Sequence, residues 1–429
     1  MTTAPYTGTW PQWQKIAFRF CFIYFGLYIL STSFSDFGTL MTYLTKFQVL
    51  IADTLVYGFN DHILHFKKEL VPLAGSGDTS YGWVQLILYL ILAFVGTIIW
   101  SILDYKRTNY RKLDFVLWNS IRYYVCFMAF SYGIIKVFLM QMSFPLLSQL
   151  ATPLGDFLPM RLSWMFIGYS NGYQFFSGLM ELTVFGLLLF RRTVLLGLFI
   201  GLGVFVNVLL LNLCYDIPVK LFSAHLVAMC LFLISPDLTR LYHFFICNRT
   251  TAISAKYHFS SARKWMRVTR IGLKVIFFVM IGLVFKESYD YYAEKPPKPS
   301  LYGVYDVDTY VRNRDTIPVL AKDSIIWKDV IFDRFRMVSV NSTDTVLRQN
   351  YRRGYFYYKQ DSLAGTLDCY KWDHGDSTYL WKIKYRKEKD RIYLQYKSGA
   401  DSIRISLRDN HRKFQLERRE FHWLSESNR

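Results

Sequence analysis

Apolar runs close to the length of a membrane span recur along the first two thirds of this 429-residue chain. A helix of about 20 apolar residues crosses the hydrocarbon core of a bilayer, so each run predicts a transmembrane helix. The expected spans lie at roughly 16–35, 82–102, 115–139, 172–190, 194–213, 218–235 and 271–288. Since 52% of the residues are hydrophobic and 18% are aromatic, the composition also favours a membrane protein. We therefore expect a mainly α, polytopic transmembrane bundle of about seven spans.

The chain changes character near residue 290. A Pro-rich run, KPPKP at 295–299, predicts a stiff linker over 291–299. Beyond it, short runs alternate polar and apolar residues between turn residues, which predicts a small antiparallel β domain at 300–429. Its expected strands lie at 324–327, 355–358, 379–385, 391–396 and 402–407. The helical domain then occupies 1–290.

Two stretches between the spans are too mixed to cross a membrane. Segment 36–80 holds an amphipathic run near 40–66 and then a Gly-Ser-Gly-Asp turn at 75–78. Segment 140–171 is interrupted by three prolines, and its Trp164, Phe166 and Tyr169 are residues that suit the membrane–water boundary. We expect both segments to lie at the bilayer surface.

The formal net charge of +19 does not indicate nucleic-acid binding, because much of it lies in short loops beside apolar runs. With seven spans, the basic loops 103–114, 191–192 and 236–270 all fall on one face. The positive-inside rule makes that face cytoplasmic. The first apolar run has no cleavage motif and is expected to be retained. We expect a bacterial inner-membrane protein with a cytoplasmic N-terminus, a periplasmic β domain and the lipid bilayer as partner.

Ionisable and polar side chains interrupt the central apolar runs. Such groups are costly at bilayer depth and usually face a bundle interior or a wet cavity, so we expect several to border one polar pocket. Four are candidate catalytic residues: Lys136, Glu181, Lys220 and His225. Five are candidate pocket-lining residues: Arg122, Asn207, Asn212, Asp216 and Ser223.

Each of these residues has more than one interpretation. Glu181 is either a proton acceptor or a buried tie to Lys136 or Arg122, and nearby Gly178 and Gly186 allow another helix to approach closely. Asn212 and Asp216 would share a helix face if the helix persists.

His225 is a proton carrier, a ligand or a hydrogen-bonding group, and a single mid-span histidine argues against a bis-histidine haem. The six cysteines form no CxxC pair, and no metal site is predicted.

The central region resembles the DoxX family of membrane proteins over roughly 115–236. The resemblance rests on Tyr132-Gly133-x-x-Lys136, on Gly178-x-x-Glu181-Leu182 and on the Leu-Phe-Arg-Arg-Thr loop at 189–193. The whole chain is similar to the long DoxX-type proteins of Bacteroidetes, through its Cys-Tyr-Asp-x-Pro-Val-Lys turn at 214–220 and an Arg-x-Phe-His-Trp segment at 419–423.

The resemblance implies a four-helix membrane unit and, through one archaeal branch linked to a thiosulfate:quinone oxidoreductase, a redox role with a quinone as cofactor. Two alternatives stay open. The first is a non-catalytic envelope module whose periplasmic β domain binds a lipid, peptide or protein. The second follows from a similarity to the transmembrane domain of vitamin-K-dependent γ-carboxylases, and its base chemistry would use Lys136, Lys220 or His225. The residues leave open whether the protein is an enzyme.

Overall fold

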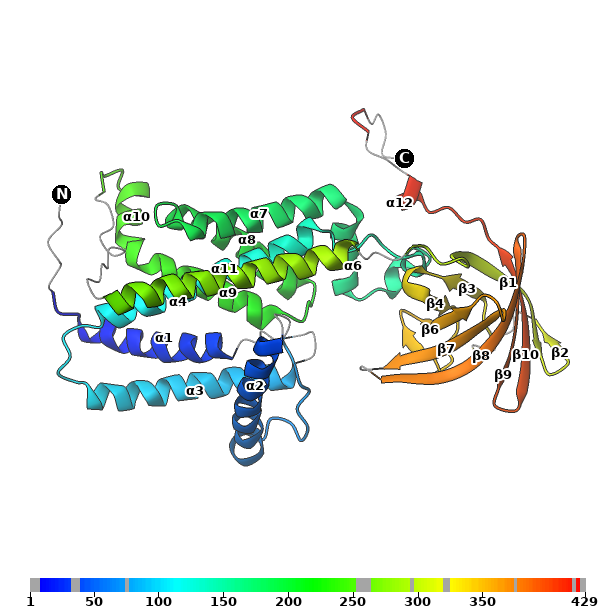
Figure 1. The fold of residues 1–429 in the computed structure, drawn as a ribbon, viewed down its shortest axis with the longest axis horizontal. Coiled ribbons are helices and arrows are strands. Elements are labelled where there is room, and N and C mark those ends of the chain that lie inside the picture. The colour runs from blue at the N-terminus through cyan, green and yellow to red at the C-terminus, as the bar shows by residue number, and fades with distance from the viewer. Residues whose placement is uncertain are drawn as a thin grey trace. The chain divides into compact units, whose positions relative to one another are not determined.

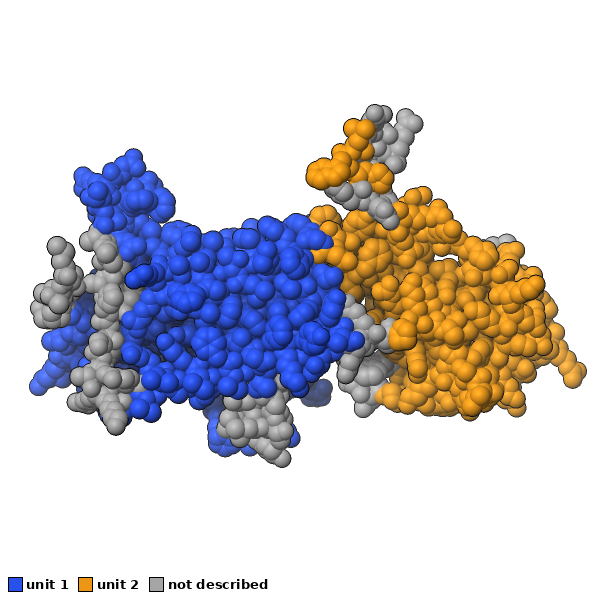
Figure 2. Space-filling model, turned by 45° about the horizontal axis from the view of Figure 1, so that its top comes forward, with its two compact units in different colours: residues 1–141, 172–293 blue, residues 142–171, 294–429 orange. Residues whose placement is uncertain are grey.

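The computed structural model describes residues 8–31, 39–73, 77–251, 264–293, 297–318, 325–373, 376–418 and 422–424. Parts of the predicted 75–78 turn, the 236–270 loop, the linker and the 419–423 motif lie outside these residues. The chain forms two compact units, a helical unit of residues 1–141 and 172–293 and a β unit of residues 142–171 and 294–429 (Figures 1 and 2).

Long helices that run roughly parallel make up most of the helical unit, whereas α2 and α10 lie across that direction (Figure 1). The helices are α1 (Gln12–Leu30), α2 (Thr39–Phe59), α3 (Ser80–Leu103), α4 (Arg111–Val137), α7 (Asn171–Leu189), α8 (Val194–Cys214), α9 (Lys220–Ile234), α10 (Leu238–Phe245) and α11 (Lys264–Ala293). The transverse α2 covers most of the amphipathic run expected near 40–66.

Within the described residues, five helical segments are long and apolar enough to cross a membrane. They are Ser80–Leu103, Asn171–Leu189, Val194–Cys214, Lys220–Phe245 and Val268–Ala293. Five of the seven expected spans therefore meet this criterion of length and composition. The other two expected spans correspond to α1 and α4, whose charged residues, such as Lys15 and Arg122, lower their hydropathy.

Helix α4 forms the centre of the helical unit. Its side chains at 121, 125, 126 and 129 are fully buried, a spacing that places them on one broad face of the helix. The indole Nε1 of Trp118 donates to the carbonyl oxygen of Leu233 in α9 at 3.2 Å. A helix at the edge of a bundle keeps one side exposed to lipid. Because α4 has so many buried side chains, other helices must pack around most of it.

Consecutive long helices alternate in direction, so the connections collect at two ends of the unit. At one end, the backbone N–H of Trp10 donates to the carbonyl of Thr108 in the α3–α4 loop. At the other end, the N–H of Gly77 donates to the carbonyl of Pro218 in the α8–α9 turn. The basic loops at 104–110 and 190–193 both lie at the first end (Figure 1).

The β unit contains a closed antiparallel barrel of eight strands with two short accessory strands. The strands are β1 (Gly303–Arg312), β2 (Asp315–Ile317), β3 (Asp329–Phe332), β4 (Met337–Val340), β5 (Arg348–Asn350), β6 (Arg353–Asp361), β7 (Thr366–Asp373), β8 (Asp376–Glu388), β9 (Arg391–Ser398) and β10 (Asp401–Asp409). Pairing of β1 with β10, from Tyr305 opposite Asp409 to Arg312 opposite Ile403, closes the ring. The accessory strands β2 and β5 pair with β1 and β6.

Aromatic side chains fill the interior of the barrel. Trp327 and Trp381 lie with their ring centroids 5.6 Å and 5.4 Å from that of Tyr396, and Phe356 packs against both tryptophans. An eight-stranded barrel is just wide enough for side chains to fill. The alternation expected from the sequence is clear in β10, where Ile403, Ile405 and Leu407 point inward.

Residues 142–171, which we call the strap, belong to the β unit although they precede it by more than a hundred residues. The strap contains α5 (Leu147–Leu150) and α6 (Pro159–Tyr169). The backbone N–H and the hydroxyl of Ser148 both donate to Oδ2 of the buried Asp333 at 2.9 Å. The strap is therefore part of the folded β unit. The sequence analysis expected this segment at the bilayer surface and did not predict that it would pack with the β domain.

Four of the five expected strands are confirmed, since they coincide with parts of β6, β8, β9 and β10. The expected strand at 324–327 is wrong for its described residues, which form a turn before β3. The turn lets Trp327 enter the aromatic core, where it is 2% exposed.

Candidate functional site

Two glycines, Gly133 near the end of α4 and Gly178 in the first half of α7, allow these helices to approach each other closely. A Cβ atom at Gly178 would lie 2.7 Å from the carbonyl oxygen of Gly133 and 2.9 Å from Cβ of Lys136. The close approach expected at Gly178 is therefore confirmed. At Gly186 it is wrong, because a Cβ there meets nothing within 4 Å.

A buried ion pair lies beside this crossing. Nζ of Lys136 donates to Oε1 of Glu181 at 2.5 Å, and both side chains are almost completely enclosed. The ammonium group also lies 5.8 Å from the ring centroid of Tyr132, one turn earlier on α4. The second carboxylate oxygen, Oε2 of Glu181, is buried and has no hydrogen-bond partner among the described residues. The pair thus retains one acceptor that the described protein atoms leave unused.

Gln174 is a second polar side chain whose hydrogen bonds are unused. It is fully buried, and neither its amide oxygen nor its amide nitrogen has a hydrogen-bond partner among the described residues. Gln174, Gly178 and Glu181 are spaced by four and three residues, so they share the face of α7 that meets α4. The unused amide and the unused carboxylate oxygen therefore lie on one helix face, about two turns apart.

His225 belongs to a separate contact with α1. Its Nε2 lies 2.6 Å from the hydroxyl of Tyr24, and its Nδ1 lies 2.6 Å from the carbonyl oxygen of Leu221. Nδ1 is therefore the N–H donor, and Nε2 accepts from the tyrosine. The imidazole also stacks on Tyr28 with ring centroids 3.8 Å apart. Both ring nitrogens and one ring face are thus engaged by the protein.

The α8–α9 turn holds the next group of predicted residues. Helix α8 ends at Cys214, and Asp216 has a φ of 50° and an exposed side chain, so the expected shared face of Asn212 and Asp216 is wrong. Asn212 donates instead to the Ser223 hydroxyl at 2.9 Å. Nζ of Lys220 lies 2.7 Å from Oδ1 of Asp216.

Asp78, from outside the predicted set, caps the first turn of α9. Its carboxylate accepts from the backbone N–H groups of Lys220 and Leu221 at 2.8 Å and 2.9 Å. It also lies 3.7 Å from the ammonium of Lys220. A carboxylate at a helix N-terminus satisfies unpaired N–H groups and the helix dipole, so Asp78 fixes the α8–α9 turn.

The two remaining predicted residues lie apart from these groups. Arg122 is buried, and its Nε donates to the carbonyl oxygen of Leu188 in the last turn of α7 at 2.7 Å. Its guanidinium lies over the rings of Trp118 and Tyr123. Asn207 is exposed on α8. Arg122 therefore ties two helices, and Asn207 faces away from the bundle interior.

The structure thus distributes the nine predicted residues over separate contacts, in which three pairs of them meet: Lys136 with Glu181, Asn212 with Ser223, and Lys220 with Asp216. The catalytic and pocket-lining roles assigned to them stay predictions. The sequence analysis missed Gln174, Tyr24, Tyr28 and Asp78. Gln174 carried the same signal as Asn207, an amide within an apolar run, whereas the tyrosines had no signal to distinguish them from membrane-boundary aromatics.

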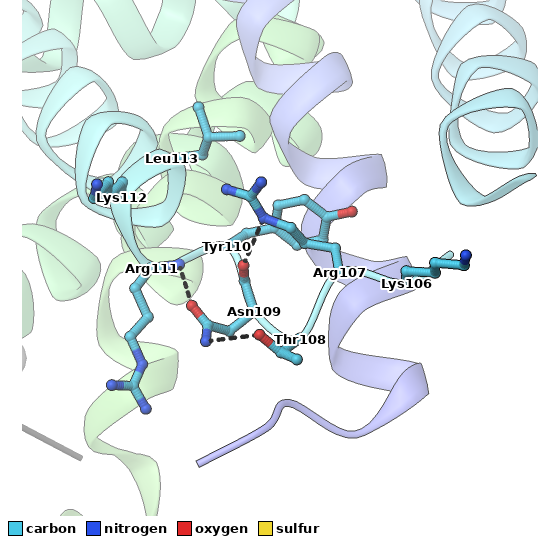
Figure 3. Close-up of a pocket in the computed structure, with 8 residues that line it drawn as sticks. All are labelled: Lys106, Arg107, Thr108, Asn109, Tyr110, Arg111, Lys112 and Leu113. Carbon is cyan, nitrogen blue, oxygen red and sulfur yellow. Dashed lines mark hydrogen bonds between the residues drawn. The ribbon is translucent and has the colours of Figure 1, made fainter. Parts of the chain in front are cut away.

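A shallow depression of about 430 Å³ lies at the opposite end, in the α3–α4 loop. Its lining includes the basic residues Lys106, Arg107, Arg111 and Lys112. In Figure 3 these side chains point in different directions and do not converge on a common point. The depression therefore has the features of a basic, solvent-facing loop at a membrane surface.

The helices and the barrel together define a polytopic membrane protein with a C-terminal antiparallel β-barrel domain. No family model matches the chain, and no solved structure matches it at a significant level. A stretch of 118 residues, 28% of this chain and 75% of its counterpart, is 35% identical to a Bacillus subtilis (strain 168) protein named "Uncharacterized protein YwoB". Through this stretch the chain belongs to the same family as YwoB.

Proposed function

We propose that the helical unit binds a quinone at the α4–α7 crossing, within the inner membrane of a bacterium. The observation that carries the proposal is the pair of unused polar groups on one face of α7. Oε2 of Glu181 and both amide atoms of Gln174 are buried and have no hydrogen-bond partner among the described residues. A buried polar group without a hydrogen bond costs about 1–3 kcal/mol, so a ligand that supplies those bonds stabilises the site.

A quinone has the chemistry that these groups require. Its carbonyl oxygens accept hydrogen bonds, which the Gln174 amide N–H can donate, and the hydroxyls of the reduced form donate to a carboxylate such as that of Glu181. Its apolar tail allows entry from the bilayer. Lys136 contacts Oε1 of Glu181 and compensates the charge of the carboxylate, which leaves Oε2 as an acceptor. The DoxX-type resemblance of the 115–236 region adds support, because it implies a redox role.

Binding of a short-chain quinone analogue to the purified full-length protein in detergent tests this proposal. Gln174→Leu should weaken binding roughly tenfold or more, because one buried hydrogen bond to the ligand is lost. Glu181→Gln should also weaken it, and Asn207→Leu, on an exposed face, serves as the control. If the wild-type protein does not bind the analogue, or if Gln174→Leu leaves its affinity unchanged, the proposal is wrong.

We further propose seven spans, with α1 and α4 in the membrane and the basic loops in the cytoplasm. Two observations support this arrangement: α1 and α4 run along the candidate spans, and the basic loops 104–110 and 190–193 lie at one end of the helical unit. The barrel would then be periplasmic. Alkaline phosphatase fused after the last residue should be active, and green fluorescent protein at the same place should be dark. The opposite pattern would invert the topology.

A non-catalytic envelope module is the second candidate function. The filled aromatic interior of the barrel favours a partner that binds its outer surface over a ligand inside it. In cells that lack the gene, a chain truncated after residue 296 distinguishes the candidates. If the truncated chain restores the phenotype, the barrel is dispensable and the helical unit carries the function.

The γ-carboxylase-like alternative needs a lysine that can act as a base. Lys136 is paired with Glu181, and Lys220 is paired with Asp216. Each Nζ is therefore engaged by a carboxylate and is not available to a substrate. These ion pairs support the quinone proposal over this alternative.

A further inference from the structure

Helix α10 of the helical unit lies across the long helices and is strongly amphipathic (Figure 1). Its polar side chains Thr239 and Arg240 precede His243 by four and three residues, so the three share one side of the helix. The rest of its circumference is apolar. The exposed members of this apolar face, with exposed fractions of 58%, 57%, 61% and 69%, are Leu238, Tyr242, Phe245 and, just beyond the helix, Ile246.

The backbone fixes where α10 begins and ends. A short 3₁₀ turn, Ser235–Asp237, separates it from α9, although the two helices together form one candidate span by length and composition. At the other end Asn248 has a φ of 49°, and the N–H of Arg249 donates to the carbonyl of His243 at 2.9 Å. An asparagine in the left-handed conformation is a common helix stop. Helix α10 is therefore a defined element with its own direction.

Contacts within the helical unit place α10 beside the first turns of α8. The ring centroid of Phe245 lies 6.0 Å from that of Phe199, and Leu241 packs against the buried core of the bundle. Phe199 is the sixth residue of α8, so the contact lies about 8 Å from the start of this candidate span. Interfacial helices bury their apolar face to a similar depth, about 5–10 Å.

Arginines accompany the apolar face. Arg240 is on the polar side of α10, where it pairs with Asp237 at 3.3 Å, and Arg249 is exposed directly after the helix. The basic loop at 190–193 precedes α8 at the same end of the bundle. An apolar face flanked by guanidinium groups is complementary to a phospholipid leaflet, which offers acyl chains to the face and phosphates to the arginines.

We propose that α10 is an interfacial helix, which lies in the leaflet at which α9 ends and α8 begins. Its apolar face inserts at the boundary between headgroups and acyl chains, and Arg240 and Arg249 contact the lipid phosphates. The inference does not depend on the quinone proposal or on which side of the membrane is cytoplasmic, because the candidate spans alone define the leaflet. All the residues that carry it belong to one compact unit.

Spin labels in the full-length protein test the inference. The label is attached to a ketone-bearing amino acid, so that the native cysteines are kept, and the protein is reconstituted in vesicles of phosphatidylethanolamine and phosphatidylglycerol. Oxygen concentrates in hydrocarbon, whereas a nickel chelate stays in water. We expect the ratio of oxygen to nickel collisions to be several-fold higher at position 242 than at position 239. A label at Ile91, exposed in the middle of α3, gives the reference value for lipid.

Three results at these positions would overturn the inference. A water-type ratio at position 242 would show that the face is solvated. Few collisions with either reagent there would show that protein, such as a second copy of the chain, covers it. A lipid-type ratio at both 242 and 239 would show that α10 crosses the membrane instead of lying at its surface.

A charge variant tests whether the apolar face drives insertion. With the label at position 246, the double substitution Leu238→Glu and Tyr242→Glu should lower the ratio to that of a water-exposed site, because two charges oppose burial in lipid. Thr239→Glu, on the polar side, is the matched control and should leave the ratio unchanged. The label at position 91 should keep its lipid value in both variants, which shows that the bundle persists. An unchanged ratio at 246 in the double variant would contradict insertion.

Discussion

At the scale of single residues, the Lys136–Glu181 pair has one carboxylate oxygen with a hydrogen bond and one without. Oε1 of Glu181 receives the ammonium group, whereas Oε2 has no partner among the described residues. A buried ion pair gains from Coulomb attraction but loses the solvation of both charges, so its net contribution to stability is small. Removing one partner is much worse than removing both.

Substitution of the pair should reveal this asymmetry. Lys136→Met leaves a buried carboxylate without its counter-charge and should lower the free energy of unfolding by about 3–5 kcal/mol. The double variant Lys136→Met with Glu181→Leu should be much closer to the wild type. Thermal unfolding in detergent micelles measures both. If the double variant is as unstable as the single one, the charge balance of the pair is not what stabilises the crossing.

Buried acidic groups in the barrel predict a loss of its stability at alkaline pH. Burial raises the pKa of the Cys369 thiol above its ordinary value of 9.0 and the pKa of the Tyr305 and Tyr358 hydroxyls from 10.0 to about 12. The unfolded chain therefore releases these protons at a lower pH than the folded barrel does.

The stabilisation is complete below about pH 9 and declines as pH rises toward 12. Denaturant unfolding of the barrel, followed by tryptophan fluorescence, should show a midpoint that falls over this range. A midpoint that stays constant up to pH 11 would contradict the expected protonation of these groups.

At the scale of helices, the α4–α7 crossing depends on the absence of a side chain at Gly178. Gly178→Ala places a Cβ within 3 Å of atoms of Gly133, Lys136 and Val137. The helices must separate, and we expect a loss of about 1–3 kcal/mol, as for other overpacked cores. Gly186→Ala is the matched control on the same helix, because its Cβ meets nothing within 4 Å. Equal effects of both substitutions on thermal unfolding would refute the close crossing.

The sequence predicted the positions of helices and strands more successfully than it predicted which of them pack together. Apolar runs located the long helices because lipid and core both require continuous apolar surface, and alternation located β6, β8, β9 and β10. The place of the strap in the β unit was not predictable, since the Ser148–Asp333 contact joins residues 185 positions apart. No local pattern encodes such a pairing.

The candidate site could be predicted only in part, because packing between helices also decides which of its residues meet. Charged residues within apolar runs identified Lys136 and Glu181, because an intramembrane charge needs a partner. Helix periodicity could not show that His225 contacts α1 rather than the other polar residues, since the choice depends on how the helices pack. Asp216 was misplaced because α8 ends two residues before it.

At the scale of the whole molecule, the β unit is assembled from two separate parts of the chain. The strap contributes Leu147 to an apolar cluster with Val304, Ile331 and Phe414 of the second part. The carboxylate of Asp333 adds two hydrogen bonds to Ser148. These contacts predict that the strap is held by a small number of buried groups.

Asp333→Ala should loosen the strap. It removes both hydrogen bonds to Ser148, and bonds to a charged acceptor contribute about 1.5–3 kcal/mol each. Limited proteolysis should then cut within 142–171 faster than in the wild type. The control is Asp361→Ala, whose carboxylate accepts two backbone N–H groups within its own turn. If the strap of the Asp333→Ala variant is cut no faster than that of the control, other contacts hold it.

The division of the β unit also has a consequence for biosynthesis. A ribosome adds roughly 5–20 residues per second, so residue 333 emerges some 10–40 s after residue 148. During that interval α5 and α6 have been made, but the strands they pack against do not yet exist. The apolar side of the nascent strap is therefore unburied until those strands have been made, and a stop in translation before residue 333 leaves it without the partner that buries this side.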